Sequence, residues 1–131
     1  MSTLKTKILT PYGTVYDGDV TGIQMPGRVG SFEVRYNHAP IISILDVGKL
    51  TIRETGDSEA LYAISGGYVE VNDNVVTVLA ESAERKDKID VQRAEEARKR
   101  AEQEIRTKKA RDMNAEMALK RAINRIRVSE L

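Results

Sequence analysis

Four arginines in the last third of the chain have the type and spacing of an anion-binding site. Arg93 and Arg100 are seven residues apart, or two turns of an α-helix, and Arg121 and Arg125 are four apart, or about one turn. A guanidinium offers a planar fork of donors that fits a phosphate group. If these segments form a helical hairpin, the four cations can converge on one phosphate or other anion.

The same arginines also fit a solvated helix surface, on which each cation pairs with a carboxylate four residues away. Glu96 with Arg100 and Glu102 with Arg106 have this spacing. The solvated surface is the default explanation for such runs, and the surplus of cations on two short segments is the argument for the anion site against it.

Residues for catalysis are sparse. His38 is the only histidine, and no nucleophile and carboxylate are spaced to complete a triad with it. Residues 65–67 (Ser-Gly-Gly) lack the Lys and Ser/Thr of a phosphate loop, so we interpret them as a bulge or corner between strands. Gly27 and Gly30 similarly predict a turn. The chain has no cysteine, which excludes disulfides and thiol chemistry, and we expect no enzyme.

The elements that must position these residues differ in character along the chain. Residues 1–84 carry 6 Lys and Arg against 11 Asp and Glu, whereas residues 85–131 carry 15 against 9. All 9 glycines lie at or before Gly67. This partition predicts two domains, residues 1–86 and residues 87–131.

The first domain is predicted to be a small β-sandwich. Short runs of alternating or β-branched residues recur between turn signals, which favours antiparallel strands over alternating strands and helices. One hairpin should pair residues 50–54 with 59–64, and another residues 67–71 with 75–79 across the turn NDN. The predicted strands contain LKTKIL, TVYDGDVTGIQM, GSFEVRY, KLTIRE, ALYAIS, GYVEV and VVTVLA.

The second domain is predicted to be a hairpin of two helices. The first spans about residues 90–107 with Asp87 or Asp90 as its N-cap, and the second about residues 112–128, joined by KKARD. Alanines dominate the facing seam, so little apolar area is buried and the hairpin should be weakly held. The seam residues are Ala94, Ala97, Ala101 and Ile105 on the first helix, and Ala115, Ala118, Leu119, Ala122, Ile123 and Ile126 on the second.

No signal peptide and no run of about 18 apolar residues is present, so we expect a soluble chain that reaches a membrane only through a partner.

Five stretches of the sequence follow one another in the order TPYGTVYDGDV, NHAP, ISGGYVEV, VTVLAESAE and IDVQRA. In these stretches the chain resembles the epsilon subunit of bacterial F-type ATP synthase. The resemblance covers nearly the whole chain. It implies a non-catalytic rotor subunit of the central stalk, bound to the gamma subunit and the c-ring, on the cytoplasmic face of the bacterial plasma membrane. It also implies that the helices can extend toward the alpha/beta catalytic head and inhibit ATP hydrolysis.

The resemblance assigns two sets of residues. Ser31, Glu33, Asn37 and His38 match a loop that lies near the ring and gamma, although GSFEVRYNHAP lacks the glycine and apolar residues of the usual GELGILPGHAP. In some members, ATP is a regulatory ligand bound through Ile or Leu, Asp, any two residues, Arg and Ala. The matching positions are Ile89, Asp90, Arg93 and Ala94 for this motif, and Glu84, Arg100, Arg121 and Arg125 for the remaining ligands.

The alternative from another class is a free-standing nucleic-acid-binding module with its basic helices on phosphates. It lacks interleaved aromatic residues, because no aromatic follows Tyr68. We therefore expect no nucleic-acid partner and no required cofactor.

Overall fold

The computed structural model describes residues 2–107 and 112–131. The chain divides into two compact units, one ending at Arg85 and one beginning at Lys86. Apart from Asp112, the predicted connection KKARD lies outside the described residues.

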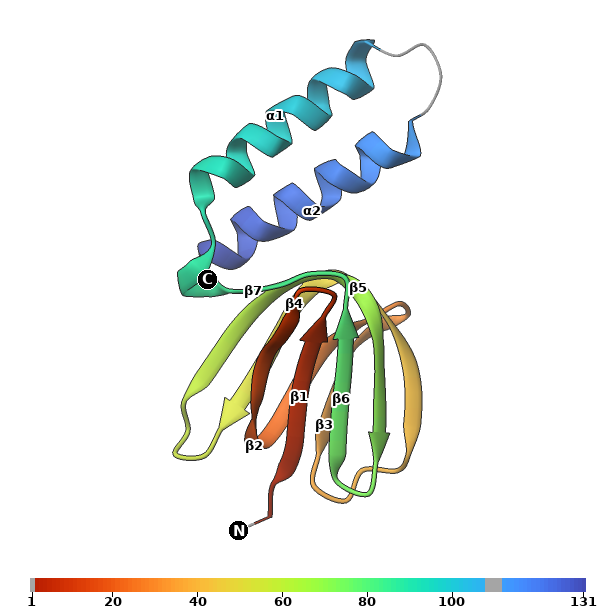
Figure 1. Cartoon of the computed structure of the whole chain (residues 1–131), viewed down its shortest axis with the longest axis vertical. Helices are drawn as coiled ribbons and strands as arrows, with labels where there is room; N and C mark the ends of the chain where they lie inside the picture. Colours follow the sequence, from red (N-terminus) through yellow and green to blue (C-terminus); the bar gives the residue numbers. More distant parts are fainter. Residues whose placement is uncertain (1, 108–111) are drawn as a thin grey trace. The chain divides into compact units, whose positions relative to one another are not determined.

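The first unit is built from seven strands (Figure 1). They are β1 (Leu4–Thr10), β2 (Gly13–Gly27), β3 (Gly30–Arg35), β4 (Ile41–Glu54), β5 (Glu59–Asn72), β6 (Val75–Ala80) and β7 (Ala83–Arg85). The predicted KLTIRE is only the second half of β4, and the segments ALYAIS and GYVEV are one continuous strand, β5. The predicted fold, a β-sandwich followed by two helices, is confirmed.

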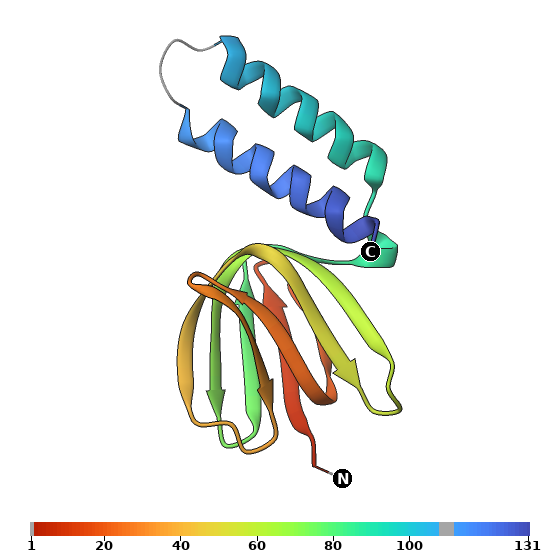
Figure 2. The same cartoon turned by 180° about the vertical axis from the view of Figure 1, so that it is seen from behind.

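The strands close on themselves. The path β1-β6-β5-β4-β2 returns to β1, while β3 pairs with β2 and β7 with β5 (Figures 1 and 2). The pairing is antiparallel as predicted, with one exception, because β1 and β6 are parallel. The ring explains the exception: five strands form it, and an odd number of strands cannot alternate in direction all the way round.

Both predicted hairpins are confirmed. Arg53 pairs with Glu59 across the first, and Asn72 pairs with Val75 across the second. The two residues of the second turn, Asp73 and Asn74, have φ angles of 50° and 61°, the left-handed conformation that a two-residue hairpin turn requires. Gly27 pairs with Gly30 around the predicted turn between β2 and β3.

The predicted corner at residues 65–67 is also confirmed, and it lies within β5. Gly67 has a φ of 140°, and a Cβ atom built there would overlap the carbonyl oxygen of Leu79 on β6. The two backbones approach each other so closely that only glycine fits. On the two sides of this corner β5 pairs with different neighbours, with β7 at residues 62–64 and with β6 at residues 67–72.

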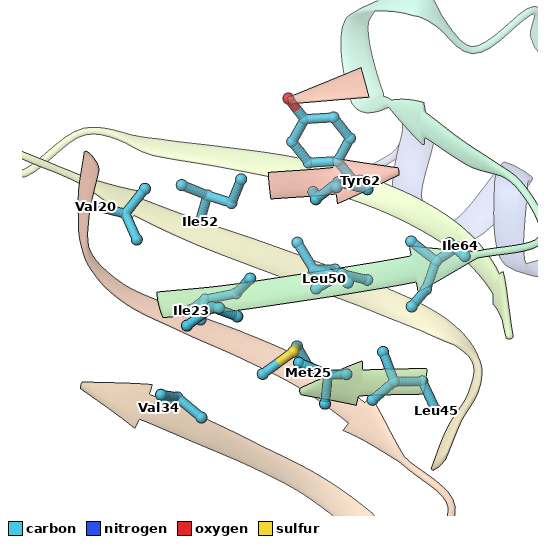
Figure 3. Packing of buried hydrophobic residues seen from close by; sticks show 14 of the residues in the cluster. Val20, Ile23, Met25, Val34, Leu45, Leu50, Ile52, Tyr62 and Ile64 are labelled. Carbon is cyan, nitrogen blue, oxygen red and sulfur yellow. The ribbon is translucent and has the colours of Figure 1, made fainter. Parts of the chain in front are cut away.

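The core of the first unit is continuous and mostly aliphatic. In Figure 3, side chains from β2, β3, β4 and β5 point into one interior. Each fully buried Leu, Ile or Val stabilises the fold by roughly 1.5–3 kcal/mol. The labelled residues are Val20, Ile23, Met25, Val34, Leu45, Leu50, Ile52, Tyr62 and Ile64.

The second unit is a helical hairpin, as predicted. A 3-10 turn (Lys86–Lys88) precedes α1 (Val91–Thr107), and α2 (Met113–Ser129) packs against α1 (Figures 1 and 2). The predicted seam is buried at Ala94, Ala101, Ala115 and Ala122, and its other members are only half-buried. Val128 is buried as well, which the predicted seam did not include.

Candidate functional site

The predicted motif at residues 89–94 forms the start of α1. Oδ1 of Asp90 accepts a hydrogen bond from the backbone N of Arg93 at 3.1 Å, so Asp90 is the N-cap, one of the two predicted. Ile89 and Ala94 are buried. Of the four motif residues, only Arg93 therefore presents an exposed side chain that neither packs nor caps.

The arginines of α1 fall into two groups. Arg98 lies 2.7 Å from Glu95 and 3.4 Å from Glu102, and Arg106 lies 3.9 Å from Glu102, which makes a ladder of ion pairs along the helix. Arg93 and Arg100 are exposed, and within the described ranges neither belongs to an ion pair. The predicted Glu96–Arg100 pair is wrong, because the carboxylates of α1 that form pairs face Arg98 and Arg106 instead.

The remaining predicted ligands lie on different elements. Arg121 and Arg125 are half-buried on α2, one turn apart. Glu84 is half-buried on β7 in the first unit, whereas the other seven predicted residues belong to the second. All four predicted arginine ligands therefore belong to the helical hairpin.

The loop between β3 and β4 contains the predicted partner residues Asn37 and His38. The backbone N of His38 donates to the carbonyl oxygen of Arg35 at 3.1 Å and closes a turn. Nδ1 of His38 lies 2.7 Å from the carbonyl oxygen of Ala39. Since a carbonyl oxygen only accepts, Nδ1 is the donor in this contact.

Glu33, also predicted to contact a partner, is engaged within its own sheet. Arg53 Nε donates to its two carboxylate oxygens at 3.1 and 3.2 Å, and Arg35 lies 2.5 Å from Oε2. Arg53 also pairs with Glu59. Glu33 therefore ties β3 to β4, and of the predicted β3 residues only Ser31 is exposed.

An apolar row crosses the outside of the sandwich, and sequence analysis missed it. Leu9 pairs with Leu79, Leu79 with Tyr68, and Tyr68 with Ile44, so one residue from each of β1, β6, β5 and β4 stands side by side. Tyr68 and Ile44 are 47% and 50% exposed. We call these four residues the outer row. Each strand contributes one outward-facing residue, and the four become neighbours only through the strand register, which the sequence alone does not give.

A groove of about 410 Å³ lies along the outer row, lined by Leu9, Thr10, Pro11, Gly67, Tyr68, Leu79, Ala80 and Glu81. Contiguous exposed apolar surface of this kind is typical of a binding face.

Other kinds of site find no support in the described part of the chain. No three side chains among His, Cys, Asp and Glu gather there as a metal site would require. None of the described helices has the length and apolar character needed to cross a membrane.

Two family models match adjacent parts of the sequence. The model of the ATP synthase delta/epsilon chain, beta-sandwich domain, matches residues 3–86, and that of the long alpha-helix domain matches residues 87–130. The chain belongs to the ATP synthase delta/epsilon family. This membership favours a subunit of that complex over a free-standing nucleic-acid-binding module.

Relatives in this family match the chain along nearly its full length. It is 40% identical to the ATP synthase epsilon chain of Bacillus pumilus, with 98% of both chains covered. It is 38% identical to the ATP synthase epsilon chain of Lactobacillus gasseri, with 97% of this chain and 92% of the relative covered.

Two solved structures share the fold. A chain of the Euglena gracilis mitochondrial ATP synthase, solved as OSCP/F1/c-ring, gives a TM-score of 0.80 at 23% identity over 92% of this chain and 77% of that one. A chain of the Tetrahymena thermophila mitochondrial ATP synthase central stalk and c-ring gives 0.65 at 16% identity, over 97% and 93%.

Proposed function

We propose that this chain is the epsilon subunit of the central stalk of an F-type ATP synthase, a non-catalytic part of the rotor. The observation that carries the proposal is full-length similarity to ATP synthase epsilon chains. The sandwich couples rotation of the c-ring to the gamma subunit and so to ATP synthesis in the catalytic head.

The outer row is the face that supports docking of the sandwich on gamma. Its two central residues, Tyr68 and Ile44, are large, apolar and about half exposed. Covering such surface stabilises a complex by roughly 25 cal/mol per Å² of apolar area, before the cost of association. The loop between β3 and β4 contacts the c-ring end of the stalk through His38, at the peripheral, cytoplasmic side of the membrane, while the side chain of Asn37 is engaged by Asn74.

The helical unit acts as a brake on ATP hydrolysis by the assembled enzyme. Its interface is lined mainly by alanine, which contributes far less than the roughly 1.5–3 kcal/mol of a buried Leu or Ile. A hairpin held this weakly can exchange its internal contacts for contacts with the acidic surface of a partner, because its own net charge is positive.

ATP is the regulatory ligand of the helical unit. Arg93, Arg100 and Arg121 are the cations that support this role, because in the described ranges none of them is engaged by a carboxylate. Arg125, one turn beyond Arg121, completes the set. The nucleotide phosphates pair with these arginines as Glu95 and Glu102 pair with Arg98.

Calorimetry on the full chain separates the ATP site from general helix charge. Arg93→Ala removes a charge-assisted hydrogen bond of about 1.5–3 kcal/mol and should weaken ATP binding roughly 10- to 100-fold. Arg98→Ala is the matched control on the same helix, since its guanidinium is held by Glu95 and Glu102, and it should leave ATP binding nearly unchanged. Equal effects of the two substitutions, or no binding at millimolar ATP, would remove the ATP site and leave the brake standing.

Co-purification tests the stalk assignment itself. The full chain should be retained on a complex of gamma and c subunits. His38→Ala should weaken this retention without removing any chemical activity, because the imidazole contacts the partner. Failure of the unmodified chain to bind that complex, together with salt-sensitive binding to DNA or RNA, would overturn the assignment.

A further inference from the structure

Two asparagines join the predicted docking loop to a turn that lies far away in the sequence. The backbone N of Asn37 donates to Oδ1 of Asn74 at 2.7 Å, and Nδ2 of Asn74 donates to Oδ1 of Asn37 at 3.3 Å. Asn37 lies in the loop between β3 and β4, and Asn74 in the turn between β5 and β6. Both segments lie at one end of the sandwich (Figure 1).

Both residues adopt a conformation that favours asparagine. Their φ angles are 64° and 61°, in the left-handed region that Asn tolerates better than most residues. The backbone at each position turns sharply, and the side chain of one reaches the other. The pair therefore depends on two separate turns being formed correctly.

Asn74 is itself firmly anchored. Its carbonyl oxygen accepts a hydrogen bond from the backbone N of Lys5 at 2.9 Å, which ties the turn to the start of β1. Asn37, in contrast, lies in an exposed loop whose other described backbone tie is the turn bond from His38 to Arg35. Because the turn is tied to β1, Asn74 holds Asn37 in place rather than the reverse.

The loop held by this pair borders a groove of about 500 Å³. One side of the groove is Pro40, the last residue of the loop, with Ile41 and Ile42 of β4, and the other is Glu70, Val71 and Asn72 of β5, which precede the turn. Ile42 is 74% exposed and Tyr36 46%. The two sides are held together by strand pairing, since Ile41 pairs with Val71 and Ile42 with Glu70. The asparagine pair lies just beyond them and connects the loop to the turn.

We propose that Asn74 is a positioning residue: through its paired hydrogen bonds to Asn37 it holds the loop of residues 36–40 in the conformation that binds the c-ring end of the stalk. This inference rests on the proposed function. Without the pair, the loop samples other conformations, and the apparent dissociation constant rises by the inverse of the fraction that remains competent. Asn74 acts through the loop and touches no partner in this account.

The two hydrogen bonds predict an order of effects. Asn74→Gly removes both bonds and keeps the left-handed backbone without strain, so affinity for membranes carrying the rest of the ATP synthase should fall roughly 3- to 10-fold. Asn37→Gly removes only the longer bond, because its backbone N still donates to Asn74, and should have the smaller effect. In the double variant, Asn37→Gly should add nothing, since its partner is already gone.

Two controls separate positioning from general destabilisation. Asp57→Gly replaces another non-glycine residue of positive φ, in the hairpin between β4 and β5, and should leave the affinity unchanged. Asn74→Asp keeps the acceptor of the 2.7 Å bond and should restore most of the affinity. Hydrogen exchange of the Asn37 amide in the unbound full chain gives a direct readout: fast in Asn74→Gly, slow in the unmodified chain and in Asn74→Asp.

The outcomes distinguish this inference from the proposed function. If the unmodified chain does not bind membranes that carry the rest of the ATP synthase but lack this chain, the stalk assignment fails. If it binds and Asn74→Gly binds equally well, or the two glycine substitutions act additively, the positioning role of Asn74 is wrong while the stalk assignment stands.

Discussion

The carboxylate of Asp90 accepts a hydrogen bond from the backbone N of Arg93, three residues later, at 3.1 Å. The motif residue that would serve a nucleotide is therefore also the residue that starts α1. Capping and ligand binding can be separated, since an amide caps a helix about as well as a carboxylate but carries no charge.

Substitution of Asp90 tests that separation. Asp90→Ala should destabilise the first turn of α1 by about 0.5–2 kcal/mol, because the amide of Arg93 loses its acceptor. Hydrogen exchange of the Arg93 amide measures it. Asp90→Asn should keep the protection, and an equal loss in both variants would contradict the capping role.

Gly67 should tolerate no side chain. Gly67→Ala places a methyl group against the backbone of Leu79 and should cost at least about 3 kcal/mol of unfolding free energy, because backbone atoms must move. Gly56→Ala is the control: its φ is also positive, at 85°, but a Cβ meets nothing within 4 Å. It should cost only about 1–2 kcal/mol of backbone strain. Urea unfolding measures the unfolding free energy of both variants. Similar decreases would show that the close approach of β5 and β6 does not exclude a side chain at Gly67.

Tyr16 should make the sandwich less stable in strong alkali. Burial raises the pKa of its phenol above 10.0, and the carboxylate of Glu54 adds to this. Above about pH 10 the unfolded chain loses this proton more readily than the folded chain, so stability present below that pH falls as pH rises toward the folded pKa. Tyr16→Phe should flatten the fall in unfolding midpoint, and an unchanged slope would assign the pH dependence to other groups.

The first unit should fold without the second. Its core, from Leu4 to Ala80, is continuous and mostly aliphatic, and it draws on strands β1 to β6 alone. A fragment of residues 1–85 should unfold cooperatively by circular dichroism. A fragment that is disordered at room temperature would mean that the sandwich depends on the helices.

Sequence patterns predicted the elements whose cause is local. The turn at Asp73 and Asn74, the cap at Asp90 and the alanine seam each depend on a few neighbouring residues, and all of them appear in the structure. The parallel pair of β1 and β6 could not be predicted this way, since it follows from the number of strands in a closed ring.

The candidate surfaces divide in the same manner. Arg93 and Arg100 stand out by helical spacing alone. The outer row and the Asn37–Asn74 pair could not be found from the sequence, because each joins segments whose register or turn geometry is set by the whole sheet. The partners of Arg98 were missed for a related reason: several carboxylates on α1 have suitable spacing, and packing decides which of them pairs.

The central claim, a stalk subunit whose helices restrain the enzyme, is tested most directly by ATP hydrolysis in membranes depleted of this chain and then supplied with either the full chain or residues 1–86. Both forms should remain bound after washing. Hydrolysis should be low with the full chain and clearly higher with the truncated one, because only the full chain carries the brake. Equal hydrolysis with both bound forms would contradict the account.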